Sequence, residues 1–167
     1  MSAVGSENTD LSVNSQTSAM AGLKVIDLTR NVAGPYATKV LVEQGAEVLK
    51  IEPSGGDPSR NYGPFVDDVP DSEGSGLFLH LNRGKQSIVL DALSPEGAAQ
   101  IRAWVADGAQ LLFEDFTPGA PEDAGWGWKT LSGLNPALVM VSMVVKVFEA
   151  TMISVVAGSS FSSVSAM

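Results

Sequence analysis

Apolar and polar positions over residues 23–53 switch from a strand pattern to a helix pattern and back. Residues 24–29 are a short, mostly apolar run rich in β-branched side chains, typical of a strand buried on both faces. Apolar residues then recur at helical spacing over 35–44, and residues 47–52 predict a second strand that Pro53 ends. A helical crossover makes the two flanking strands parallel. The pattern predicts a strand–helix–strand unit.

A second unit of the same kind follows. Residues 86–91 predict a third strand and residues 110–114 a fourth, with a helical stripe of apolar side chains between them. Two such units in succession predict a doubly wound α/β fold, a parallel sheet with flanking helices.

Residues that favour helix ends support both helices. Gly34 suits an N-cap and Pro35 the first helical position of the first helix. Ser94 suits the N-cap of the second helix, with Pro95 at its first position and Gly108 as the left-handed residue after its end. The helices are therefore predicted over 35–44 and from 95 to about 107.

Residues 54–76 are rich in Gly, Pro and Ser and predict a long surface loop without a regular element. The segment 55–60 fits either a ligand-facing loop or a turn in which Arg60 pairs with a nearby carboxylate, and we prefer the second interpretation. His80 lies in an apolar run and is predicted to be a hydrogen-bonded structural residue rather than a catalyst. Arg83 and Lys85 fit either an anion-binding turn or a solvated entry to the third strand.

Composition excludes several kinds of site. The net charge of −9 argues against nucleic acid or an anionic membrane surface as a partner. The chain has no cysteine and one histidine, so disulfides, thiolate metal sites and histidine-rich metal sites are excluded, and no metal is expected. No apolar run is long enough to span a membrane.

The two ends of the chain differ from its middle. Residues 1–21 are polar, without apolar periodicity and without Lys or Arg, which predicts a disordered tail rather than a secretory signal or a mitochondrial presequence. A cytoplasmic location is predicted, with mitochondrial and peroxisomal locations left open. Residues 143–167 are apolar and Ser-rich, and their runs at 143–147 and 152–156 are expected to cover a sheet edge.

The loops that follow the predicted strands are the candidate ligand site. Ligands in open α/β sheets bind outside the carboxyl ends of the strands, which selects residues 29–34, 90–93 and 115–117. The first loop lacks the G-x-G-x-x-G fingerprint, which argues against nicotinamide and flavin dinucleotides, and the chain has no Walker sequence.

Ten short segments, in matching order and spacing, resemble the N-terminal half of class III coenzyme A-transferases. They are residues 23–30, 33–38, 45–48, 50–53, 55–60, 82–87, 90–91, 94–97, 114–119 and 134–139. This superfamily includes formyl-CoA and carnitine CoA-transferases and the related α-methylacyl-CoA racemases. The resemblance covers residues 21–142, so residues 22–142 are expected to be the Rossmann-like portion of a CoA-transferase domain.

The resemblance implies a coenzyme A or acyl-CoA substrate and the transfer of CoA between an acyl-CoA and a carboxylic acid through aspartyl intermediates. It also implies a homodimer of interlocked subunits. The matching coenzyme A contacts are Val32, Ala33, Leu90, Asp91, Asp115, Phe116 and Thr117.

The chain departs from the family pattern in two respects. Asp115 and Thr117 stand where the family commonly has asparagine and arginine, and an unpaired carboxylate there is expected to weaken the binding of an anion. Residues 143–167 depart altogether, and the family's catalytic aspartate lies beyond this junction. We therefore expect a truncated form, incomplete relative to the family fold, without a catalytic residue, inactive alone and unable to interlock. A non-catalytic CoA-binding or interaction module and a racemase-like fragment are the alternatives.

Overall fold

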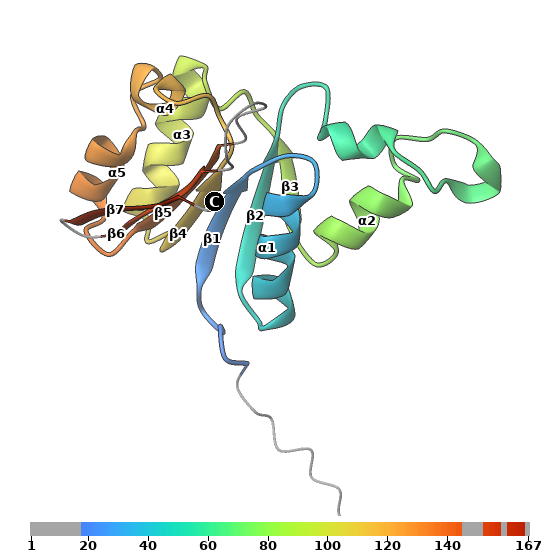
Figure 1. Ribbon diagram of the computed structural model, residues 1–167, viewed down its shortest axis with the longest axis horizontal. Helices are drawn as coiled ribbons and strands as arrows, with labels where there is room; N and C mark the ends of the chain where they lie inside the picture. The colour runs from blue at the N-terminus through green and yellow to red at the C-terminus, as the bar shows by residue number, and fades with distance from the viewer. Residues whose placement is uncertain (1–17, 145–151, 158–159, 166–167) are drawn as a thin grey trace, which may run out of the picture.

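A computed structural model describes residues 18–144, 152–157 and 160–165. Within these residues seven strands form one sheet in the order β3-β2-β1-β4-β5-β6-β7. Their bounds are β1 (Lys24–Leu28), β2 (Glu47–Glu52), β3 (Gln86–Val89), β4 (Leu111–Glu114), β5 (Val139–Val144), β6 (Met152–Ala157) and β7 (Ser160–Ser165). The pairs among β1 to β5 are parallel, and β6 and β7 are added antiparallel. The predicted α/β fold with a parallel sheet and flanking helices is confirmed (Figure 1).

Helices cover both faces of the sheet. The main ones are α1 (Ala33–Glu43), α2 (Gly76–Asn82), α3 (Pro95–Ala106) and α5 (Trp128–Leu134), with a short α4 (Ala120–Asp123). Successive residues of a strand point to opposite faces. Ile26 accordingly lies in the larger core with residues of α3 and α5, whereas Val25 lies in a smaller core beside Leu41 of α1.

Several predicted boundaries agree with the structure. The second strand, β2, has the predicted bounds, and α3 begins at Pro95. Ser94 is the N-cap of α3, and its Oγ accepts a hydrogen bond of 3.0 Å from the backbone N–H of Gly97. Local signals sufficed for both elements because strand periodicity and a cap are properties of adjacent residues.

The predicted start of α1 is wrong. The helix begins at Ala33 after the non-helical Val32, so Gly34 is inside the helix and Pro35 is its third residue. A Cβ on Gly34 would lie 2.1 Å from Oγ1 of Thr29. Glycine is therefore needed here because the first turn of α1 passes directly against the end of β1.

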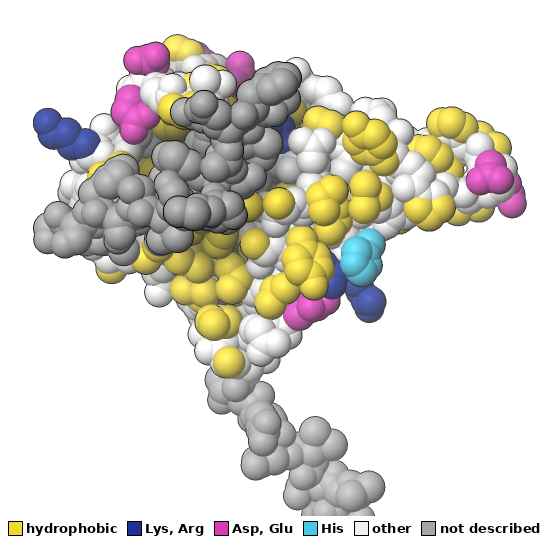
Figure 2. Space-filling view, in the orientation of Figure 1, with side chains coloured by type: hydrophobic (Ala, Val, Ile, Leu, Met, Phe, Trp, Pro, Cys, Tyr) yellow, Lys and Arg dark blue, Asp and Glu magenta, His cyan; other side chains and the backbone are white. Residues whose placement is uncertain are grey.

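The long loop after β2 projects from the body of the molecule (Figure 1). It is less irregular than predicted, because it contains the 3₁₀ turns η1 (Pro58–Asn61) and η2 (Val66–Asp68) before α2. His80 lies on α2 and is exposed, and its imidazole makes no hydrogen bond to any described residue, so the predicted hydrogen-bonded structural role is wrong. Tyr36 and Val40 of α1 and Leu79 of α2 are exposed apolar side chains. Figure 2 shows apolar side chains on the surface over the projecting loop and the neighbouring helices.

The two ends of the chain are described only in part. The predicted tail lies outside the described residues up to residue 17, but Ser18 to Ala21 form turns, and the N–H of Met20 donates to the carbonyl of Gln44 over 2.9 Å. At the other end, β6 pairs with β5, so the run at 152–156 covers a sheet edge as expected, whereas residues 145–147 lie outside the described part. No helix in the described ranges has the length and apolar character needed to cross a membrane.

Candidate functional site

The loops after β1 and β4 are joined by Arg30 and Asp115. The backbone N–H of Arg30 donates to Oδ2 of Asp115 over 2.8 Å, and its Nε donates to Oδ1 over 3.0 Å. Its Nη2 also donates to the backbone carbonyl of Asp115 over 3.3 Å. The carboxylate that was expected to be unpaired is therefore paired, which corrects the expectation drawn from the sequence.

A small pocket of about 50 Å³ lies at this edge of the sheet. Its lining comes from the ends of β1 and β2 and from the loops that follow β1, β2, β3 and β4: Leu28, Arg30, Ile51, Pro53, Leu90, Asp91, Ala92 and Phe116. The Arg30 guanidinium lies 5.5 Å from the centre of the Phe116 ring. Three of the predicted coenzyme A contacts, Leu90, Asp91 and Phe116, therefore line one pocket. This is the edge of the sheet at which ligands of open α/β sheets bind.

The other predicted contacts surround this pocket without lining it. Val32 and Ala33 are exposed at the start of α1, Thr117 is exposed after β4, and Asp115 is half-buried beneath Arg30. Contact with coenzyme A stays a prediction for all seven residues.

A buried ion pair joins β1 to the entry of β3. Nζ of Lys85 donates to Oδ2 of Asp27 over 2.9 Å, and also to Oδ1 of Asn82 and the carbonyl of Pro35 over 2.9 Å each. Asp27 and the Lys85 side chain are almost fully buried. Neither interpretation of Lys85 from the sequence is correct, because its ammonium group is buried against Asp27 and is exposed neither to a ligand anion nor to solvent.

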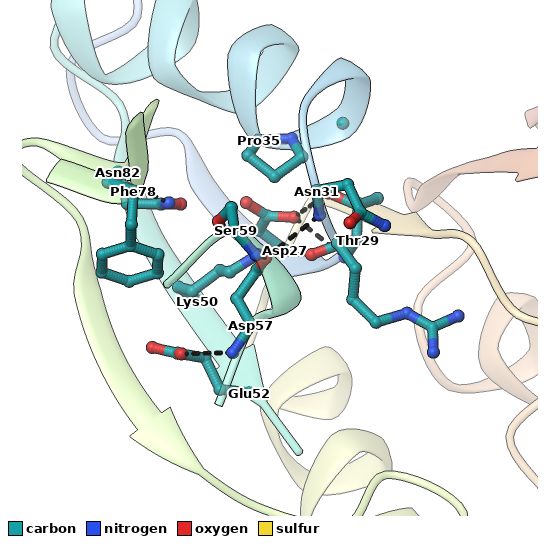
Figure 3. A network of polar contacts seen from close by, with 12 residues as sticks. Asp27, Thr29, Asn31, Pro35, Lys50, Glu52, Asp57, Ser59, Phe78 and Asn82 are labelled. Carbon is teal, nitrogen blue, oxygen red and sulfur yellow. Dashed lines mark hydrogen bonds and ion pairs between the residues drawn. The ribbon is translucent and has the colours of Figure 1, made fainter. Parts of the chain in front are cut away.

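A second buried pair holds the turn after β1 (Figure 3). Nζ of Lys50 donates to Oδ2 of Asp57 over 2.8 Å and also to the carbonyl of Thr29. Oδ1 of Asp57 accepts from the backbone N–H of Asn31 over 3.1 Å. Asn31 has a φ of 64°, in the left-handed region that non-glycine residues rarely adopt. The pair therefore helps to fix a strained turn beside the predicted contacts Val32 and Ala33.

Arg60 pairs with a carboxylate, which confirms the preferred interpretation of its turn. Its Nε and Nη2 donate to the two carboxylate oxygens of Glu52 over 2.6 and 2.8 Å, and Nη1 donates to Glu73 over 3.0 Å. Its guanidinium also lies 3.6 Å from the centre of the Phe78 ring. Arg60 fastens the projecting loop to β2 and is not presented to a ligand.

Burial and pairing change the pKa of several of these groups. Burial raises the pKa of Glu52, but hydrogen bonds from Arg60, Ser87 and the backbone outweigh it and lower the pKa to about 2. Burial likewise raises the pKa of Asp27, but the charges of Lys50 and Lys85 outweigh it, so the net shift is downward. Burial raises the pKa of Glu114 at the end of β4, since hydrogen bonds to it only partly offset the lost solvation.

Sequence reasoning predicted a carboxylate partner for Arg60 without identifying Glu52, and it missed the two buried lysine pairs, although the sequence carries a signal for all three. Asp27 interrupts an apolar strand, and Lys50 and Glu52 interrupt the next one. A charged side chain in a strand buried on both faces needs a partner, because burial of an unpaired charge is costly. The pattern indicated that partners exist, but not that they are Lys85, Asp57 and Arg60.

A larger cavity of about 370 Å³ lies at the opposite end of the sheet. Lys24, Glu47 and Gln86, the first residues of β1, β2 and β3, contribute to its lining together with Trp104 and Asp107. It contains none of the predicted contacts. We place the candidate site at the strand ends, because the paired charges and the predicted contacts converge there. Within the described residues, no cluster of three or more His, Asp or Glu side chains is placed to hold a metal ion.

Comparison with known proteins identifies the family. Residues 20–145 match the family described as CoA-transferase family III. The chain belongs to CoA-transferase family III. It is 43% identical over 122 residues to acetyl-CoA:oxalate CoA-transferase of Acetobacter aceti, covering 72% of this chain and 30% of that protein. It is 39% identical over 127 residues to succinate–glutarate CoA-transferase of Agrobacterium fabrum, covering 74% and 32%.

Solved structures agree with this assignment to CoA-transferase family III. The orthorhombic form of Rv3272 from Mycobacterium tuberculosis superposes with a TM-score of 0.68 at 35% identity, covering 77% of this chain and 35% of that one. A CAIB/BAIF family protein from Brucella suis superposes with a TM-score of 0.67 at 35% identity, covering 76% and 33%. The chain therefore spans about a third of the length of the family III relatives that it matches.

Proposed function

We propose that this member of CoA-transferase family III binds coenzyme A at the edge of the sheet where β1, β2, β3 and β4 end. The observation that supports the proposal is the convergence there of Leu90, Asp91 and Phe116 around a pocket beside the Arg30–Asp115 pair. The pocket, at about 50 Å³, is much smaller than the roughly 300–1,000 Å³ of a typical ligand cavity, so it would take only a part of coenzyme A while the rest lies along the sheet edge. Val32, Ala33 and Thr117 would extend the contact along the same edge.

The reaction that we propose for the complete family fold is transfer of CoA from an acyl-CoA to a carboxylic acid. The relatives named above carry this chemistry in their names, acetyl-CoA with oxalate and succinate with glutarate. A carboxylate nucleophile has to be accessible to the thioester. Asp27 and Asp57 are fully buried in ion pairs with lysines, and Asp115 is paired with Arg30.

We infer that none of these three aspartates is the nucleophile. We infer the same for the exposed Asp91, because the family resemblance implies a catalytic aspartate beyond residue 142. Residues 22–142 then contribute the CoA-binding part of the enzyme. On this proposal residues 22–142 bind CoA and do not catalyse the transfer by themselves. The interlocked homodimer of the family, its absence here and a cytoplasmic location stay predictions.

Calorimetry on the purified chain tests the proposal. Titration with coenzyme A should give micromolar binding at one site per chain, and titration with NAD under the same conditions should give none. Absence of heat with coenzyme A, confirmed by an unchanged melting temperature, would contradict the proposal.

An exchange assay separates binding from catalysis. Acetyl-CoA is incubated with the chain and isotopically labelled oxalate or succinate, and new acyl-CoA is measured by mass spectrometry. We expect binding without exchange. Measurable exchange would show that the chain contains a nucleophile and would overturn the assignment of a non-catalytic module.

A further inference from the structure

Asp115 places a negative charge at the edge of the sheet where an anionic ligand is expected to bind. Its side chain is 17% exposed beneath Arg30, and Asp91, which lines the pocket at this edge, carries another carboxylate. Coenzyme A carries phosphates, and two uncompensated carboxylates at this edge would repel them. Among the residues that line the pocket, Arg30 carries the one positive charge, and it is paired with Asp115.

The pairing of Arg30 with Asp115 is geometrically complete. Both carboxylate oxygens of Asp115 accept hydrogen bonds from Arg30, at 2.8 Å from its backbone N–H and 3.0 Å from its Nε. The guanidinium is held further by the Asp115 carbonyl and by the Phe116 ring. A pair fixed at four points has little freedom to separate, so its two charges act on a ligand as a small dipole and not as an exposed anion.

We propose that Arg30 is a positioning residue that cancels the charge of Asp115 and thereby allows an anionic ligand to bind at this edge. The inference rests on the proposed function, because it concerns coenzyme A at the same site. Arg30 acts through Asp115 and need not touch the ligand. Removal of both charges should therefore leave binding intact, whereas removal of Arg30 alone should not.

Two other carboxylates near Asp115, those of Glu114 and Asp91, support this role. Glu114 lies next to Asp115 along the chain, and its pKa is raised by burial and, to a smaller degree, by the charge of Asp115, so the carboxylates of this loop influence one another. Asp91 is only partly compensated, since its Oδ1 accepts a single backbone hydrogen bond of 3.0 Å from Leu93. Without Arg30 the ligand would therefore meet Asp91 in the pocket and an unpaired Asp115 beside it, with no cation among the residues that line the pocket.

A double-mutant cycle read out by calorimetry with coenzyme A tests the inference. Arg30→Met should raise the dissociation constant about tenfold at low salt, and less at high salt, because screening weakens the repulsion by Asp115. Arg30→Met with Asp115→Asn should return the constant to within about threefold of the wild type. Asp115→Asn keeps an oxygen that can accept from the backbone N–H of residue 30, so the turn retains that contact.

Matched variants separate charge from folding. Lys24→Met removes a cation from the exposed Lys24–Asp107 pair at the opposite end of the sheet and should leave the dissociation constant unchanged. Arg30→Lys keeps the charge without the forked geometry and should bind within about threefold of the wild type. Circular dichroism and urea unfolding confirm that each variant is folded.

The outcomes distinguish this inference from the proposed function. If the wild type does not bind coenzyme A, the proposed function fails and the inference fails with it. If the wild type binds but the double variant stays as weak as Arg30→Met, Arg30 acts by some means other than charge compensation and the inference alone is overturned. Binding by Arg30→Met equal to that of the wild type, or by Arg30→Lys as weak as that of Arg30→Met, would overturn it as well.

Discussion

Lys50 and Asp57 form an ion pair with almost no solvent contact, at 1% and 0% side-chain exposure. Removal of one partner leaves the other charge buried and unpaired, which typically costs about 3–5 kcal/mol. We expect Lys50→Met to lower the free energy of unfolding by about this amount in urea titrations. Lys50→Met combined with Asp57→Asn should lose less, because no buried charge is left.

The exposed pair Lys24–Asp107 supplies the matched control. These side chains are 51% and 82% exposed, so Lys24→Met should change the free energy of unfolding by less than about 1 kcal/mol. Equal losses in Lys50→Met and Lys24→Met would show that burial of the inner pair has little effect on stability.

Gly34 shows how a single atom decides where a helix can pass. A Cβ at this position would meet three atoms of Thr29 within 2.5 Å, and Thr29 is itself fully buried. We expect Gly34→Ala to lower the free energy of unfolding by about 1–3 kcal/mol, the usual range for overpacking, as measured by thermal and urea unfolding.

A second glycine in a helix is the control for this substitution. At Gly133 of α5, no atom of the described residues lies within 4 Å of the position that a Cβ would take, and the φ is not positive. Gly133→Ala should therefore be neutral or slightly stabilising, because alanine is the better helix former. A loss in Gly34→Ala no larger than that in Gly133→Ala would argue against the contact with Thr29.

At the scale of elements, caps decide where helices begin. Ser94 caps α3 through its hydrogen bond from Gly97, and its own hydroxyl donates to the carbonyl of Asp91 over 2.8 Å. Ser94→Ala should cost about 1 kcal/mol in the free energy of unfolding, and Ser94→Asp should retain most of the stability because aspartate also caps. Differential scanning calorimetry of the three proteins measures this, and equal melting temperatures for Ser94→Ala and the wild type would contradict the role of the cap.

The projecting loop after β2 depends on contacts that span elements. Arg60 of η1 joins it to Glu52 of β2, and Oγ of Ser75 donates to the carbonyls of Ser59 and Tyr62 over 2.9 and 2.6 Å. Ser75 also caps α2. These hydrogen bonds explain why a segment whose composition predicts an irregular loop contains two 3₁₀ turns and leads into a helix.

At the scale of the whole molecule, the paired carboxylates predict acid sensitivity. The pKa of Glu52 is lowered from 4.5 to about 2 in the folded chain, so its contribution to stability is present above about pH 4.5 and is lost as the pH falls toward 2. The Glu52→Gln variant has no carboxylate at this position to protonate, so this contribution does not change with pH. We expect the variant to show a smaller decrease in the free energy of unfolding between pH 5 and pH 3 than the wild type, measured by urea titration at each pH.

Glu96→Gln is the control for acid sensitivity. Glu96 is exposed in the first turn of α3 and lies outside the buried pairs. The Glu96→Gln variant should lose stability with acid as the wild type does. Identical pH profiles for Glu52→Gln and the wild type would mean that the Glu52–Arg60 pair does not contribute to acid sensitivity.

Local sequence determined much of the sheet and its helices. The bounds of β2 and the start of α3 follow from periodicity and a cap, which depend only on neighbouring residues. The edge that carries the candidate site also followed from the sequence, because parallel strands place their carboxyl ends together. The first turn of α1 and the short helices α2 and α5 were missed or misplaced, since short or uncapped helices give weak local signals.

Only the tertiary structure decided which charges meet. Lys85 and Asp27 are 58 residues apart in the chain, and Arg30 and Asp115 are 85 apart. The sequence by itself required partners for charged residues in apolar strands, because an unpaired buried charge is costly. Several cations and carboxylates could satisfy that requirement, and the packing of the loops after β1, β2 and β4 selected one arrangement. In that arrangement Lys85, a candidate anion-binding residue by sequence, is a buried structural cation. Asp115, expected to be unpaired, is one half of an ion pair.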